Sequence, residues 1–169
     1  MQQRERKMKQ QAGFTLIELV VVILILSVLA ATALPRFMDV QQDAHIAAVK
    51  GAGGGLGSAI SLAHAQWVAN GHTGAVDNLV GFGDGTVDMH ANGWPTSTNG
   101  VNTNPDANRC VQIWNGVMQN PPPAGTAAGT VDYVASASGS ICTYDYQPAG
   151  NMSITYDVSN GAVTVDSVF

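Results

Sequence analysis

The sequence predicts an α+β protein in which a long N-terminal helix leads into a C-terminal antiparallel sheet. Residues 14–34 form an apolar run of 21 residues whose only charge is Glu18. After Pro35, apolar residues recur every three or four positions as far as Trp67, which is the period of a helix. From Cys142 onward, apolar and polar residues alternate between turns rich in Gly, Asn and Pro, which is typical of a meander of strands.

The apolar run is long enough to cross a membrane. As a helix rising about 1.5 Å per residue it spans roughly 31 Å, the thickness of a bilayer core. Residues 1–13 carry a local charge of +3, so the remaining residues carry −8 within a total of −5. Because basic residues mark the cytoplasmic side of membrane helices, residues 1–13 are expected to stay inside and the acidic body to cross outward. An acidic body also argues against nucleic-acid binding.

Two ordinary interpretations of this run stay open. A secretory signal peptide would end in a small-x-small cleavage site, which Ala31-Thr32-Ala33 offers, although its apolar part is usually shorter. A plain transmembrane anchor would explain the length and the flanking charge. Neither accounts for Glu18, one turn inside the run, because a carboxylate at membrane depth is costly and usually has a function and a partner. The simpler alternative is that the Glu18 side chain extends back to the membrane–water interface.

A third interpretation comes from the stretch MKQQAGFTLIELVVVILILSVLAATALP, residues 8–35. It resembles the N-terminus of type IV pilins and their pseudopilin relatives, and the similarity covers about residues 8–67. The family pattern is a short basic leader ending in Gly, then Phe, Thr, Leu, Ile or Val, Glu and a long apolar run. The resemblance implies that Gly13 ends the leader and that Phe14 is the first mature, N-methylated residue. Family leaders are usually shorter than 13 residues, so translation is expected to start at Met8, or residues 1–7 are an extension.

The resemblance also implies roles for Glu18 and Pro35. In a filament of bundled apolar helices, a buried carboxylate is strongly unfavourable unless it is paired. The available cation is the α-amino group of Phe14, on the same or a neighbouring subunit, and this pairing would fix axial register. Pro35 falls where many members of the family have a proline that kinks the helix.

What the resemblance implies about function is a prepilin, the structural subunit of a type IV pilus used for attachment, adhesion or motility. The expected partners are a prepilin peptidase that is also the methylase, an inner-membrane platform, an assembly ATPase, membrane lipid and other copies of the subunit in a homopolymer. The subunit would sit in the inner membrane as a single-pass protein with a periplasmic head, and then in the extracellular pilus. The alternative is a pseudopilin of a type II secretion system. The apolar stretch and the later Asn92-Gly93-Trp94-Pro95 look most like mannose-sensitive haemagglutinin major pilins.

The helix is expected to continue beyond Pro35 through residues 35–70 and to end near Asn70-Gly71, a good C-terminal signal. The stretch 51–57, GAGGGLG, weakens this prediction, because each interior Gly costs about 1 kcal/mol relative to Ala. A helix packed closely on a sheet could tolerate it. The expected apolar stripe consists of Phe37, Val40, Ala44, Ala48, Ala52, Leu56, Ala59, Ala63 and Trp67.

The rest of the chain is divided into a connecting segment, residues 71–108, and a sheet head, residues 109–169. The segment is rich in Gly, Asn, Asp and Thr and predicts an irregular connection. Strands are expected at residues 109–115, 130–135, 142–147, 152–158 and 163–168. In an exported domain Cys110 and Cys142 would form a disulfide that joins a strand to the meander. Two reduced, buried cysteines are the alternative.

No catalytic constellation or cofactor motif stands out, so an enzyme is not expected. The stretch GAGGGLG lacks the Gly-Lys-Ser/Thr of a phosphate loop. His45 and His64 are expected to be helix-surface or packing residues. Asp77, Asp84 and Asp88 could hold calcium through oxygen ligands but lack the EF-hand pattern, so an ordinary surface loop is the simpler interpretation.

Overall fold

The computed structural model describes residues 13–168, and the predicted leader residues 1–12 lie outside it. The chain divides after Val40 into two compact units, which are described separately. Helix α1, Leu16–Ala69, runs through both, so the predicted long helix is confirmed, as is the α+β class. The second unit adds helix α2 and two sheets, and its strands are β1 Asp88–Met89, β2 Pro95–Ser97, β3 Ala124–Gly125, β4 Tyr133–Ser138, β5 Ile141–Tyr146, β6 Ser153–Asp157 and β7 Ala162–Asp166.

Helix α1 ends where the Asn-Gly pair predicts. Gly71 has a φ of 74°, a conformation that glycine adopts without strain. Its amide donates to the carbonyl of Val68 at 2.9 Å, and the amide of His72 donates to that of Trp67 at 3.3 Å. These two bonds form the Schellman motif, which satisfies carbonyls that the last helical turn leaves free.

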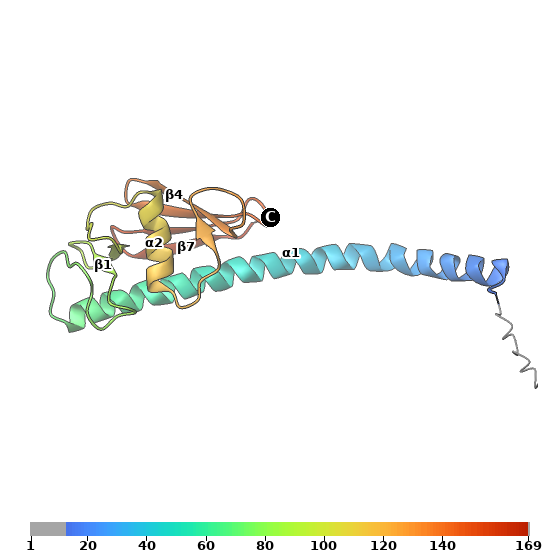
Figure 1. Cartoon of the computed structure of the whole chain (residues 1–169), viewed down its shortest axis with the longest axis horizontal. Helices are drawn as coiled ribbons and strands as arrows, with labels where there is room; N and C mark the ends of the chain where they lie inside the picture. Colours follow the sequence, from blue (N-terminus) through green and yellow to red (C-terminus); the bar gives the residue numbers. More distant parts are fainter. Residues whose placement is uncertain (1–12, 169) are drawn as a thin grey trace, which may run out of the picture. The chain divides into compact units, whose positions relative to one another are not determined.

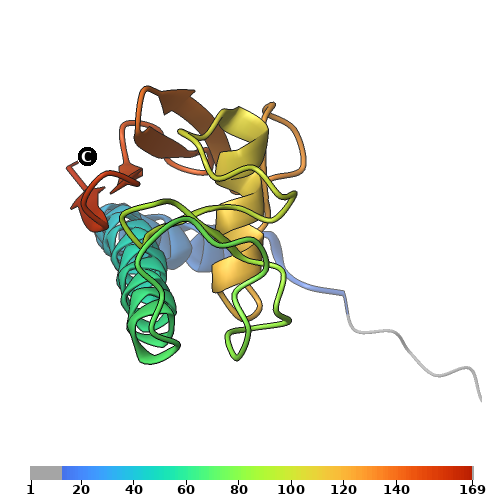
Figure 2. The same ribbon diagram turned by 90° about the vertical axis from the view of Figure 1, so that its left-hand side faces the viewer.

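The main sheet of the second unit has the strand order β3-β4-β5-β6-β7. Strands β4 to β7 form the predicted antiparallel meander, with Cys142 opposite Tyr156 and Ile154 opposite Val165. Only β3 is parallel to its neighbour. The first strand of the meander starts at Tyr133, three residues later than predicted. Figures 1 and 2 show this sheet along one side of the C-terminal half of α1, with α2 beside it.

The sheet rests on a line of α1 that differs from the predicted stripe. Leu56 and Ala63 are buried as predicted, but Ala44 and Ala48 are exposed. The prediction was wrong at these positions because small residues on neighbouring faces of the helix give nearly equal apolar patterns, which do not show which face the sheet covers. The residues of α1 that are buried are Val49, Gly53, Leu56, Ile60 and Ala63.

Gly53 explains part of the glycine-rich stretch. A Cβ at this position would lie 2.3 Å from Cγ2 of Val165 on β7, so no side chain fits between helix and strand. The close approach of α1 to the sheet therefore requires glycine here. Across the same interface the core continues into buried Ile154 and the aromatic residues Trp114, Tyr133, Tyr144 and Tyr156.

The strand predicted for residues 109–115 is wrong, because these residues belong to helix α2, Ala107–Val117. Asp106 caps this helix, and its carboxylate accepts a hydrogen bond from the amide of Arg109 at 2.9 Å. The buried residues of α2 recur at helical spacing and are Cys110, Ile113, Trp114 and Val117. The alternating apolar letters around Cys110 imitate a strand, but the cap and the longer period favour a helix.

Cys110 and Cys142 form the predicted disulfide, with their Cα atoms 5.6 Å apart. It joins α2 to β5, not a strand to the meander as expected. Both cysteines are fully buried. Beside them the Tyr144 hydroxyl donates to the carbonyl of Cys110 at 2.8 Å, and burial raises the pKa of this phenol well above its usual value. The loop-entropy model assigns such a bridge about 3–4 kcal/mol.

The connection from α1 to α2 is mostly irregular, with β1 and β2 as its short strands. Its centre is Asp88, a fully buried carboxylate. Asp88 accepts hydrogen bonds from the amide of Asn78 at 3.0 Å, the hydroxyl of Ser97 at 2.6 Å and the amide of Gly100 at 2.7 Å. Three separated parts of the loop are thus tied to one side chain.

Candidate functional site in the N-terminal apolar segment

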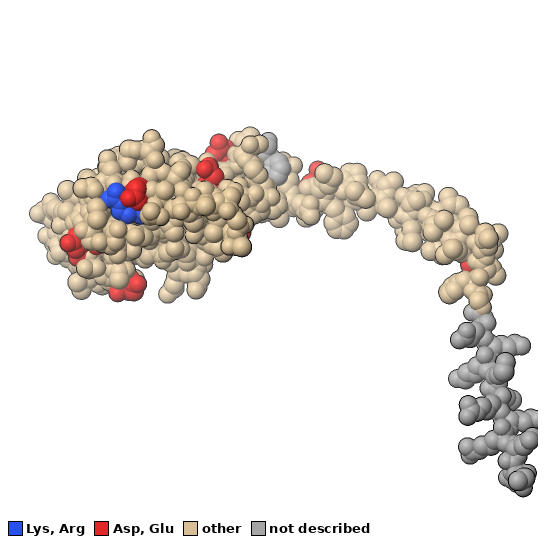
Figure 3. Space-filling view, turned by 45° about the horizontal axis from the view of Figure 1, so that its top comes forward, with Lys and Arg blue, Asp and Glu red and all other residues tan. Residues whose placement is uncertain are grey.

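The first unit presents a helix covered with apolar side chains that contact little else in their own unit. The exposed fraction of its large apolar residues from Leu16 to Leu34 runs from 39% at Val20 to 81% at Leu16. On the face shown in Figure 3 this segment is almost free of charged side chains. By length and composition α1 includes a window that could cross a membrane. An apolar surface of this size is stable only in lipid or against a partner.

The predicted cleavage site lies just before this helix. Gly13, Phe14 and Thr15 are outside regular structure, and Phe14 is 91% exposed. A Cβ built on Gly13 would meet nothing within 4 Å. The peptide bond between Gly13 and Phe14 is therefore accessible to a protease. Packing within the described residues does not explain why residue 13 is a glycine.

Thr15 and Glu18 form a reciprocal cap at the start of α1. The Glu18 carboxylate accepts hydrogen bonds from the amide and the hydroxyl of Thr15, both at 2.8 Å. In return, the hydroxyl of Thr15 accepts a hydrogen bond from the amide of Glu18 at 3.3 Å. This capping box satisfies free donors of the first turn and suits a negative charge at the helix N-terminus. This capping box was not predicted, although the Thr-x-x-Glu spacing is visible in the sequence.

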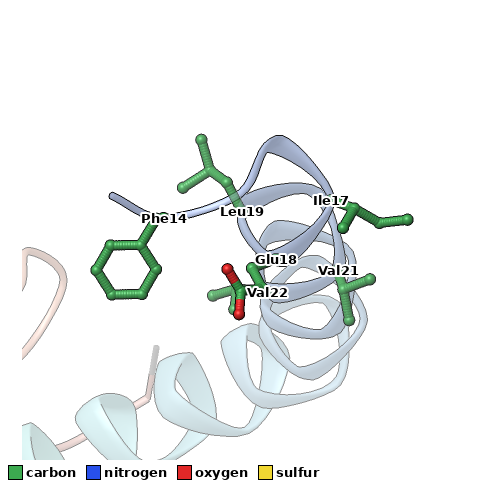
Figure 4. Close-up of a pocket in the computed structure, with 6 residues that line it drawn as sticks. All are labelled: Phe14, Ile17, Glu18, Leu19, Val21 and Val22. Carbon is green, nitrogen blue, oxygen red and sulfur yellow. The ribbon is translucent and has the colours of Figure 1, made fainter. Parts of the chain in front are cut away.

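Glu18 also lies in a shallow apolar pocket (Figure 4). The Phe14 ring and Val22 lie on the same side of the helix as the carboxylate, whereas Ile17 and Val21 point to the other side. The carboxylate is thus a polar group surrounded by apolar ones and placed next to the first residue after the predicted cleavage. It can hold a cation, provided that the cation arrives at the same end of the helix.

The other predicted site residues lie elsewhere. Pro35 lies inside α1, which continues through it. His45 Nδ1 lies 3.0 Å from the Tyr146 hydroxyl, and His64 Nδ1 lies 2.6 Å from the carbonyl oxygen of Gly93, so both histidines bind protein groups.

The calcium hypothesis finds no support in the described part of the chain. Within residues 13–168, no three His, Cys, Asp or Glu side chains come together in a way that could hold a metal ion. Asp88 is committed to protein donors, as described above. Asp84 accepts hydrogen bonds from the amide and hydroxyl of Thr86, which lower the pKa of its carboxyl. Both carboxylates therefore organise the loop.

Comparison with known proteins points to the same segment. Residues 8–34 match the family model described as the prokaryotic N-terminal methylation motif. The chain is also 44% identical over 54 residues to the type IV narrow pilus major component PilA5 of Thermus thermophilus. That match covers 32% of this chain and 47% of the relative, so the chain spans about half the length of the curated relative that it matches. No solved structure matches the chain significantly. The chain thus matches the methylation motif near its N-terminus and is similar over part of its length to a type IV pilus major component.

Proposed function

We propose that this chain is the precursor of a structural subunit of a type IV pilus filament that serves attachment, adhesion or motility. The observation that carries the proposal is the run of exposed apolar side chains on α1 within residues 8–34, which match the methylation motif. The apolar surface of such a helix is covered first by lipid and then by the helices of other copies. The role is structural and not catalytic, and no cofactor or nucleic acid is part of it.

The first step of the proposal is processing. A membrane peptidase cuts between Gly13 and Phe14 and methylates the new amine of Phe14. Two features support this: both residues lie outside the helix, and glycine lets a backbone enter an active site without a side chain in the way.

The mature N-terminus tests this step. Mass spectrometry of purified surface material should find a chain that begins at methylated Phe14, and Gly13→Ala should leave the leader attached. The uncleaved variant also reports whether translation starts at Met1 or Met8. A mature chain that begins beyond Leu34 would mean that the apolar segment is a discarded signal peptide, and the proposal would fail.

The second step is assembly, in which the Glu18 carboxylate pairs with the amine of Phe14 of a neighbouring copy. Cleavage creates this cation at the end of the helix where Glu18 lies. Once both groups leave water, either one alone would be a costly buried charge. The pair therefore favours the axial register that joins them.

Two variants separate this pairing from the capping role of Glu18. In Glu18→Gln the side-chain oxygen can still accept from Thr15, so the cap is kept while the charge is lost; Glu18→Ala loses both. Both variants should reach the membrane at the wild-type level and should form at least tenfold fewer filaments, as counted by electron microscopy. Normal filaments from Glu18→Gln would refute the ion pair and leave the cap as the role of Glu18.

The proposed location follows from the charge distribution. The basic residues 1–13 remain cytoplasmic, the subunit waits in the inner membrane with its head in the periplasm, and an assembly ATPase and platform move it into an extracellular filament. A pseudopilin of type II secretion is the second candidate, since it would share this N-terminus. The similarity to a pilus major component favours the pilin. Labelled filaments on the cell surface would decide for a pilin, and a secretion defect without surface filaments would decide for a pseudopilin.

A further inference from the structure

A row of aromatic rings, here called the aromatic chain, runs through the second unit. Trp114 of α2 contacts Tyr133 of β4, with their ring centroids 4.8 Å apart, and Tyr133 contacts Tyr146 of β5 at 5.2 Å. Tyr146 in turn contacts the imidazole of His45 on α1 at 5.7 Å. These separations are typical of aromatic rings in contact. Side chains from four elements thus form one continuous path.

Burial decreases along the aromatic chain. Trp114 and Tyr133 are 0% and 1% exposed, whereas Tyr146 and His45 are half-buried. Tyr133 and Tyr146 lie opposite each other on β4 and β5, so strand pairing fixes this step. The indole N–H of Trp114 donates to the carbonyl of Pro122 at 2.9 Å, which holds the inner end in place. The path therefore leads from a fixed indole in the core to a phenol near the surface.

The outer end of the aromatic chain has a proton acceptor. The Tyr146 hydroxyl lies 3.0 Å from Nδ1 of His45, and with the imidazole proton on Nε2 this nitrogen accepts the hydrogen bond. Burial and the charge of Asp132 raise the pKa of the Tyr146 phenol above its ordinary value, so the phenol keeps its proton at neutral pH. By contrast, the Tyr144 hydroxyl donates to the carbonyl of Cys110, which does not take up a proton.

This difference matters for the loss of an electron. A phenol that loses an electron becomes a strong acid, so its oxidation is favourable only where a base takes the proton at the same time. Tyr146 has such a base in His45, and Tyr144 has a backbone carbonyl in its place. The aromatic chain therefore ends at the phenol that is prepared for oxidation.

We propose that the aromatic chain carries oxidising equivalents out of the core and that Tyr146 is the site where they arrive. A one-electron oxidant of the peroxyl-radical class takes an electron from Trp114 and becomes a peroxide anion. The Trp114 radical cation then takes an electron from Tyr146 across the ring of Tyr133, and the phenolic proton moves to Nδ1 of His45. The products are an intact Trp114, a neutral tyrosyl radical and an imidazolium ion, so electrons and charge balance.

The proposed function of the path is protection of the core. Hydroxylation of Trp114 would place a polar group in a buried site without a partner for it, which is costly. A radical on half-buried Tyr146 can instead be returned to the phenol by a soluble donor of one electron and one proton, such as ascorbate. This inference does not depend on assembly into a filament, and its tests use the full chain in detergent.

Flash photolysis tests the path. A laser pulse ionises buried and exposed indoles alike, and the tyrosyl radical should then grow in as the indolyl radical decays. Trp114→Phe and Tyr146→Phe should reduce the amplitude of this phase at least tenfold. Tyr144→Phe is the matched control, because Tyr144 lies even closer to Trp114, at 4.6 Å, but donates to a carbonyl. A phase that survives in Tyr146→Phe, or that disappears in Tyr144→Phe, would overturn the proposal.

A second pair of variants tests the proton acceptor. In His45→Gln the side-chain oxygen can still accept the hydrogen bond from Tyr146, but it is not a base. The growth of the tyrosyl radical should be at least tenfold slower in this variant, and in the wild type it should be slower in heavy water than in water. His64→Gln is the control on the same helix, because His64 is bonded to the carbonyl of Gly93. A wild-type rate in His45→Gln would refute proton transfer to His45.

The protective role has its own measurement. Wild type, Tyr146→Phe and Tyr144→Phe would be exposed to peroxyl radicals from a water-soluble azo initiator, and oxidation of Trp114 would be quantified by peptide mass spectrometry. Tyr146→Phe should show at least threefold more oxidised Trp114 than the other two chains. Equal oxidation of Trp114 in all three would overturn the protective role.

Discussion

At the scale of single residues, glycines of α1 that look alike in the sequence have different surroundings. Gly53 lies against Val165, where a Cβ would be 2.3 Å from a methyl carbon, whereas Gly54 faces open space. The letters GAGGGLG do not distinguish these positions, because the difference depends on a strand more than a hundred residues away. The local rule that glycine weakens a helix therefore holds at Gly54 and is overridden at Gly53.

Alanine at position 53 and alanine at position 54 should therefore change the free energy of unfolding in opposite directions. Gly54→Ala should stabilise the protein by about 1 kcal/mol through helix propensity. Gly53→Ala should destabilise it by about 1 kcal/mol or more, because overpacking at a tight interface costs about 1–3 kcal/mol and exceeds that gain. Denaturant unfolding of both variants in the same detergent would measure the two values. Equal stabilisation by both changes would contradict the tight contact with Val165.

Glu18 shows what residue-scale patterns could and could not predict. The motif from Gly13 to Glu18 was predictable because it is a run of consecutive residues, so its information is local. The capping box is equally local, since its signal is the three-residue spacing between Thr15 and Glu18, but it was not predicted. By contrast, the three donors that bind Asp88 come from Asn78, Ser97 and Gly100, and no local pattern predicts that they meet.

At the scale of elements, the antiparallel meander was predictable and α2 was not. Gly161, at a φ of 75°, and its neighbours mark the turn between β6 and β7, and the alternating residues around them fit strands buried on one face. Residues 109–115 alternate over too short a stretch to separate a strand from one face of a helix. The decisive signal was Asp106, which stands at the start of α2 with its side chain on the Arg109 amide.

Replacement of this cap gives a prediction with a defined pH dependence. The hydrogen bond from the Arg109 amide, aided by the positive charge of Arg109, lowers the pKa of the Asp106 carboxyl below 3.8. Its stabilising effect is therefore fully present above the unfolded value of 3.8 and is lost as the pH falls through the lower folded value. Asp106→Ala should cost about 1 kcal/mol at pH 7, and the difference from wild type should shrink in strong acid.

Thermal unfolding between pH 2 and pH 7 would measure the difference in stability between wild type and Asp106→Ala. Asp106→Asn is the control, because its amide oxygen can cap the helix at every pH. A loss in Asp106→Ala that stays constant down to pH 2 would show that the charge of the cap does not matter.

At the scale of the whole molecule, the division after Val40 separates two kinds of surface. Among the described residues, the packed core lies within residues 41–168, while most of the large exposed apolar side chains lie in the first unit. The sequence predicted both parts, from the apolar run, from the helical and strand periodicities and from the family resemblance. It did not predict the shallow groove that Gly51 and Gly55 of α1 form with Phe82 and Met118, because these residues come from segments far apart in the chain.

A chain reduced to residues 41–169 should therefore be soluble without detergent. It keeps every buried residue of the core as well as the disulfide. We expect a monomer in size-exclusion chromatography and one cooperative thermal transition in circular dichroism. Aggregation of this fragment, or a gradual melt, would show that the first unit contributes to folding of the second.

The disulfide has a mechanical consequence for a protein that is pulled along its chain. The cysteines are 32 positions apart in sequence, but their Cα atoms are only 5.6 Å apart. An extended chain gains up to about 3.5 Å per residue, so the bridge withholds roughly 110 Å of contour length. A subunit stretched between its ends would lengthen by that much less when oxidised than when reduced, and α2 and β5 would stay joined after the rest had unravelled.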